Sequence, residues 1–168
     1  MLNRLMGAAA GLALAWGAQA APLTLSGALT NAGATYSIAD LQALPSTTQT
    51  VTIGGTAASY TGVSLWDLLG TSIIPSPGGG NPVLRSYIVA SGTDGRSVLS
   101  AGEINPGFGG TGAPVLVAYE KDGMALGTAQ LIVPADGTGA RSLGALTGLD
   151  VRGLPFSPGP GGLSGRSR

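Results

Sequence analysis

Arg141 and Ser142 follow a glycine-rich turn, and together these residues could bind an anion. The turn spans Asp136–Gly139, in which Gly137 and Gly139 permit positive φ and leave backbone N–H groups uncovered. Uncovered amides, a guanidinium and a hydroxyl are the groups that recognise a phosphate or another oxyanion. The alternative interpretation is a β-turn with a solvated arginine. The two glycines, the arginine and the serine are therefore candidate ligand-binding residues.

The catalytic chemistry open to this chain is narrow, because the sequence contains neither cysteine nor histidine. A thiolate metal site, a cysteine nucleophile, a Ser-His-Asp triad and a histidine proton shuttle are all excluded. Any catalysis would have to use carboxylates, tyrosines, lysine, arginine or a bound cofactor. No catalytic residue and no metal ligand is predicted.

Residues 1–20 are typical of an export signal peptide. Arg4 supplies the positive charge, an Ala/Leu/Gly-rich core follows, and Ala18-Gln19-Ala20 has the small-x-small cleavage pattern. We expect cleavage after Ala20 and a periplasmic or secreted protein without a membrane span. Removing 20 of the 168 residues leaves 148, enough for one domain.

The charge of the expected mature chain argues against nucleic acid as a partner. Loss of Arg4 leaves seven of the eight basic residues against eight acidic ones, so no basic surface for a polyanion is expected. Because cysteine is absent from an exported chain, side-chain packing alone must hold the fold.

Short β-type runs alternate with short capped helices along the chain. A serine followed three residues later by an acid predicts a helix start at Ser37, Ser64 and Ser100. Runs that alternate apolar and polar residues, or are rich in β-branched residues, predict strands. The predicted strands are 23–27, 47–53, 84–90, 115–120, 131–133 and 146–152. The sequence therefore predicts a β-rich α+β domain over 21–152 and a flexible tail over 153–168.

The ordered segments resemble the oxidoreductase molybdopterin-binding domain family, which has the fold of sulfite oxidase. The similar segments are Tyr60–Leu69, Tyr87–Gly95, Val115–Gly127 and Leu131–Leu143. The resemblance implies mixed sheets with a few short helices, and it places the segment that contains Arg141 at a pterin cofactor. It also draws attention to Asp94, in the Asp-Gly turn between two strands, where ligand contacts are often placed.

Two departures from the family pattern bear on function. A family cysteine binds molybdenum on the loop before Tyr60, but this chain has Ile53–Thr56 there and offers only the Thr56 hydroxyl. The lysine that follows the arginine in the family is replaced by Gly144-Ala145-Leu146.

Three functional hypotheses follow. The first is a non-catalytic or accessory binding domain that holds molybdopterin, a small oxyanion or a periplasmic protein partner, without a metal. The second is a molybdenum cofactor-dependent oxidoreductase, similar to sulfite oxidase, with a non-cysteine metal ligand. The third is a surface interaction domain with an empty cleft.

Overall fold

The computed structural model describes residues 21–75, 81–108 and 112–154. The predicted signal peptide and nearly all of the predicted tail lie outside them, so both remain predictions. Within the described residues, no helix is long and apolar enough to cross a membrane.

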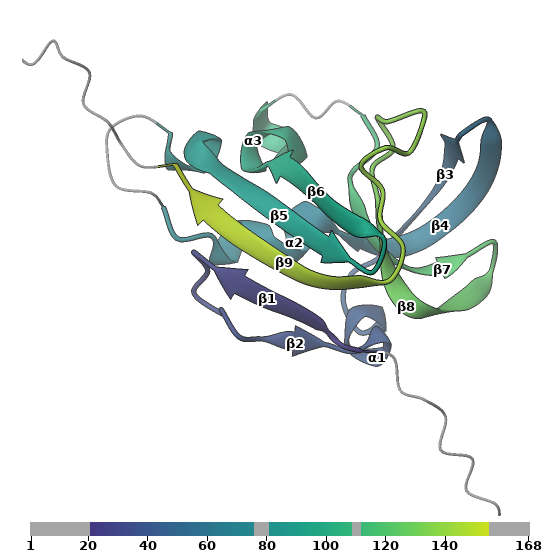
Figure 1. Cartoon of the computed structure of the whole chain (residues 1–168), viewed down its shortest axis with the longest axis horizontal. Helices are drawn as coiled ribbons and strands as arrows, with labels where there is room; N and C mark the ends of the chain where they lie inside the picture. The colour runs from purple at the N-terminus through teal and green to yellow at the C-terminus, as the bar shows by residue number, and fades with distance from the viewer. Residues whose placement is uncertain (1–20, 76–80, 109–111, 155–168) are drawn as a thin grey trace, which may run out of the picture.

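The described strands form two sheets, shown in Figure 1. The first sheet has the order β2-β1-β9-β5-β6, and the second has the order β3-β4-β7-β8. Neighbouring strands are antiparallel except β1 and β9, which run parallel. The first sheet contains β1 (Leu23–Gly27), β2 (Thr35–Tyr36), β5 (Ser86–Gly92), β6 (Gly95–Ser100) and β9 (Leu146–Gly153). The second contains β3 (Thr47–Ile53), β4 (Thr56–Ser64), β7 (Leu116–Lys121) and β8 (Met124–Ile132).

Short helices join the strands. The described α-helices are α1 (Ile38–Gln42), α2 (Leu65–Leu69) and α3 (Ala101–Ile104), and the 3-10 helices are Gly70–Ser72, Pro82–Arg85 and Pro106–Phe108. The predicted starts at Ser37, Ser64 and Ser100 are all confirmed as N-caps. The predicted β-rich α+β fold is therefore confirmed.

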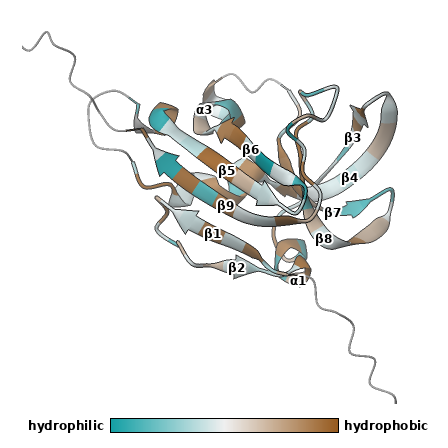
Figure 2. Cartoon of the chain, viewed as in Figure 1, coloured by the Kyte–Doolittle hydropathy of each residue, from teal (hydrophilic) through white to brown (hydrophobic). Residues whose placement is uncertain are grey.

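One apolar core joins the two sheets. Inward side chains of the first sheet, such as Leu25, Ile88 and Leu149, belong to the same buried cluster as Val63 and Val117 of the second sheet. The pleat places these side chains on one face of each strand, and Figure 2 shows hydrophobic and hydrophilic residues alternating along β9. The pairing of the sheets therefore follows from burial of their apolar faces.

Strand β7 is buried on both faces, as its apolar sequence indicates. Val117 and Tyr119 face the main core, whereas Leu116 and Ala118 join a smaller cluster with Tyr60. Tyr60 and Tyr119 are each only 6% exposed, so both rings are core residues.

Two local predictions were wrong. The strand predicted from Leu84 begins at Ser86, because Asn81 caps a 3-10 helix whose first turn contains a proline. The stretch Thr56–Ser64, for which no strand was predicted, forms β4, which runs directly into α2.

Candidate functional site

Arg141 is held by two carboxylates. Its Nε and Nη2 atoms donate to Asp136 at 2.9 and 2.8 Å, and its backbone N–H donates to the same carboxylate at 3.2 Å. Its Nη1 atom lies 2.8 Å from Oε1 of Glu103 on α3. Two separate elements therefore position the guanidinium.

These pairs change the protonation equilibria of the groups. The side-chain hydrogen bond from Arg141 holds the pKa of the Asp136 carboxyl below its usual value. The same bond, followed by the contact with Glu103, raises the pKa of Arg141. The positive charge of Arg141, which the sequence predicts to bind an anion, is thus already paired with carboxylates of the protein itself. An external anion at Arg141 would compete with Asp136 and Glu103.

The other candidate residues of this loop shape its backbone. Gly139 has φ +71°, donates its N–H to Asp136 O at 2.7 Å, and lies against the Ile53 side chain. The Ser142 hydroxyl accepts from Val133 N at 3.0 Å. Gly137 accepts a backbone hydrogen bond from Gly54 at 3.0 Å, which ties the loop to the hairpin between β3 and β4.

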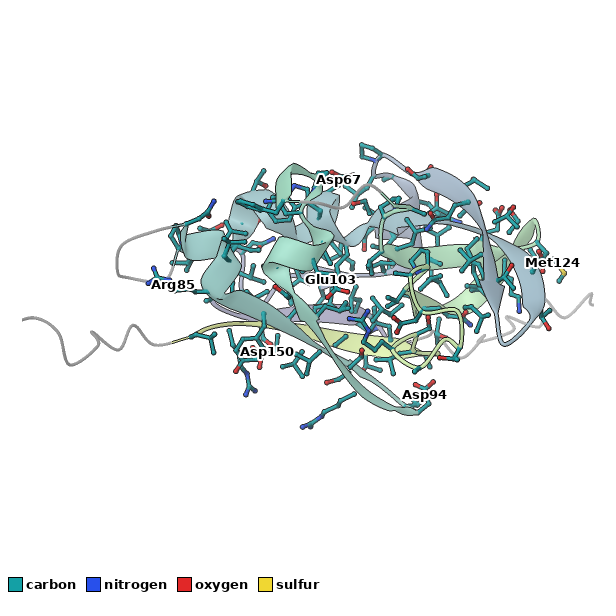
Figure 3. The ribbon with its side chains drawn as sticks, turned by 90° about the horizontal axis from the view of Figure 1, so that it is seen from above. Asp67, Arg85, Asp94, Glu103, Met124 and Asp150 are labelled. Atoms are coloured by element: carbon teal, nitrogen blue, oxygen red, sulfur yellow. The ribbon has the colours of Figure 1, made fainter. Side chains whose placement is uncertain are left out.

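Thr56 and Asp94 belong to two different hairpins, Thr56 to that of β3 and β4 and Asp94 to that of β5 and β6. Thr56 is exposed at the start of β4, where it pairs with Ile53, and it does not line the pocket described below. Asp94, in the turn between β5 and β6, accepts from Gly144 N at 2.8 Å. Figure 3 shows Asp94 well away from Asp67 and Glu103. Asp94 therefore contacts the end of this loop directly, whereas Thr56 belongs to the hairpin whose Gly54 donates to Gly137.

Asp94→Ala is expected to lower the free energy of unfolding by about 1 kcal/mol, because the Gly144 N–H loses its acceptor. Asp94→Asn keeps a side-chain oxygen and should lose less. Urea denaturation with an unchanged m-value measures both changes. Equal stability of Asp94→Ala and the parent protein would show that this contact does not hold the loop.

A pocket of about 460 Å³ opens beside Glu103, between α2, α3 and the segments 112–115 and 133–135. Its wall includes Trp66, Asp67 and Glu103, together with the apolar side chains of Ile104 and Val133. A second hollow of about 390 Å³ shares part of this wall and continues along β3. The volume is within the range of small-molecule sites.

The sequence did not identify this pocket. Its spacing predicts helix caps at Asp67 and Glu103 and a core position for Trp66. Of the three predicted serine–acid pairs, only Ser37 and Asp40 form a complete capping box, in which each side chain accepts a hydrogen bond from the backbone of the other residue. Ser64 accepts from Asp67 N at 3.3 Å, and Ser100 accepts from Gly102 N at 3.2 Å.

The carboxylates of Asp67 in α2 and Glu103 in α3 therefore do not cap their own helices and are available for other contacts. Trp66 is half-buried and its ring lies against Gly70. No sequence signal indicated that α2 and α3 would line the same pocket, since that depends on the sheet topology.

The chain is similar in structure to the sulfane dehydrogenase SoxCD from Paracoccus pantotrophus. The superposition has a TM-score of 0.59 at 17% sequence identity, and it covers 79% of this chain. The fold is sulfite oxidase-like. The chain spans 38% of the length of that neighbour. No protein-family model matches the sequence. A search of curated proteins finds no relative.

The donor set of this site does not match that expected for a molybdenum centre. The sequence has no thiolate or imidazole, and the part of the chain that the structure describes contains no group of three acidic residues arranged to hold a metal. The cofactor phosphate would need a cation, yet Arg141 is paired with two carboxylates. The Thr56 hydroxyl is a poor substitute for a soft sulfur ligand.

Proposed function

We propose that this chain is an exported, non-catalytic binding domain that holds a small ligand in the pocket between α2 and α3. The observation that carries the proposal is a roomy pocket, walled by Trp66, Asp67 and Glu103, in a chain without cysteine or histidine. Such a pocket can bind a small molecule, but it lacks the soft ligands on which the metal chemistry of the fold depends.

The occupants predicted from the sequence fit this proposal to different degrees. A pterin ring presents N–H donors on its edge, which carboxylates can accept. A small oxyanion at Arg141 would have to displace Asp136 or Glu103 from the guanidinium. A periplasmic protein partner could use the same opening. Each occupant remains a prediction.

Purification from a molybdenum-replete host tests the proposal. We expect protein without stoichiometric molybdenum, as measured by metal analysis, because the chain supplies no thiolate or imidazole ligand. Absorbance and fluorescence of the denatured supernatant report any pterin. One molybdenum atom per chain, together with turnover of a substrate, would overturn the proposal.

The contribution of Arg141 is tested separately. If a pterin or phosphate co-purifies through this residue, Arg141→Ala should lose it, whereas Arg96→Ala should retain it. Arg96 is a suitable control because it is an exposed arginine in β6, outside the pocket lining. Retention of the ligand by Arg141→Ala would place the anion elsewhere.

A further inference from the structure

The walls of the pocket carry negative charge, and we propose that its ligand is a small organic cation, an ammonium group on an apolar body. This inference rests on the proposed function, because it concerns the ligand of the same pocket. It assigns the pocket a ligand of opposite charge to the oxyanion predicted from the sequence.

Asp67 supplies the first negative charge. Its backbone N–H is used by the Ser64 cap, but among the described residues its carboxylate makes no ion pair or hydrogen bond. Asp40, at the equivalent place in α1, instead accepts hydrogen bonds from the Ser37 backbone and hydroxyl at 2.8 and 2.6 Å. Asp67 is exposed and lines the pocket, so it can accept from a ligand donor.

Glu103 supplies the second negative charge. Arg141 contacts its Oε1 atom, but the same guanidinium makes two hydrogen bonds with Asp136. Two carboxylates therefore share one cation, and the group as a whole remains negative. Among the residues that the structure describes, no lysine or arginine lines the pocket.

The remaining wall fits the body of such a ligand. Trp66, Ile104, Val115 and Val133 provide apolar contact, and an indole is the most favourable aromatic partner for a cation. Figure 3 shows Asp67 and Glu103 on one side of the first sheet and Asp150 on the other. The negative charge and the aromatic ring thus lie together in one pocket.

Titration with 2-phenylethylammonium, 2-phenylethanol and 3-phenylpropanoate tests the assignment, because these probes share a phenyl group and differ in charge. Trp66 is the only tryptophan from residue 21 onward, so the fluorescence of the mature chain reports on the pocket wall. We expect the ammonium to bind at least about fivefold more tightly than the alcohol, and the carboxylate to bind most weakly. Added salt should weaken only the ammonium complex appreciably.

Two matched variants locate the charge. Asp67→Asn is expected to weaken ammonium binding about fivefold, the effect of one exposed ion pair, while Asp150→Asn leaves it unchanged. Both substitutions remove one negative charge, but Asp150 pairs with Arg152 on the far face of the sheet. Circular dichroism of both variants shows whether they fold. Equal affinities for the three probes, no binding of the ammonium, or equal effects of the two variants would overturn the inference.

Failure here differs from failure of the proposed function. If pterin or phosphate co-purifies and the ammonium does not bind, the cationic assignment falls and the binding domain stands. Stoichiometric molybdenum with turnover removes the proposed function itself.

Discussion

Replacing Gly62 with alanine is expected to lower the free energy of unfolding by about 3 kcal/mol. Gly62 lies in β4 at the shift of register against β7. A Cβ atom there would lie 2.6 Å from the Ala118 Cα and 2.8 Å from the Val117 carbonyl carbon. These atoms belong to the backbone of a strand buried on both faces, so they cannot rotate away. Thermal unfolding should show a decrease in Tm of roughly 10 °C.

Gly127→Ala is the matched control. Gly127 lies in β8 of the same sheet, and nothing lies within 4 Å of the position its Cβ would take. We expect this substitution to be neutral or slightly stabilising, because alanine has less backbone freedom to lose on folding. Equal unfolding temperatures of the two variants would contradict the close approach of β4 and β7 at Gly62.

Asp136→Asn is expected to lower the free energy of unfolding by about 1.5 kcal/mol at neutral pH. The variant loses the charge-assisted hydrogen bonds to Arg141 Nε and Nη2, and Glu103 alone is left to balance the guanidinium. The effect is modest because the Arg141 side chain is 34% exposed and water screens the pair. Urea denaturation at pH 7 measures the difference.

The pH dependence of this difference is a second test of the same pair. The native pKa of Asp136 is lowered by Arg141, so the stabilisation is fully present above about pH 4, the ordinary aspartate pKa. It is lost as the pH falls through the lowered native pKa. The parent protein and Asp136→Asn should therefore converge in acid. A difference that is independent of pH would contradict the ion pair as its source.

Asp150→Asn serves as the control for Asp136→Asn. Asp150 also pairs with an arginine, at 2.7 Å, but the Arg152 side chain is 57% exposed, and Figure 3 shows Asp150 on the outer face of the first sheet. We expect no measurable change in stability. The comparison separates the loss of the Asp136–Arg141 ion pair from the loss of a negative charge at the surface.

Local sequence patterns predicted much of the secondary structure. The β-branched run at Thr47–Ile53 and the alternation at Leu23–Gly27 are strands, and all three serine caps start helices. The strands β4 and β6 were missed. In β4 the run of small and hydroxyl residues from Thr56 carries a weak apolar signal, and it becomes a strand through pairing on both sides.

The sequence by itself determined which chemistry is absent and which local elements form, because both depend on residue type and short spacing. The lack of cysteine and histidine, the caps and the alternating strands are of this kind. Only the tertiary structure decided that Arg141 pairs with Glu103, and that Trp66 and Asp67 share a pocket with that carboxylate. The Trp66-Asp67 pair, Glu103 and Arg141 are far apart along the chain, and their meeting depends on how the sheets pack. No local period encodes that arrangement.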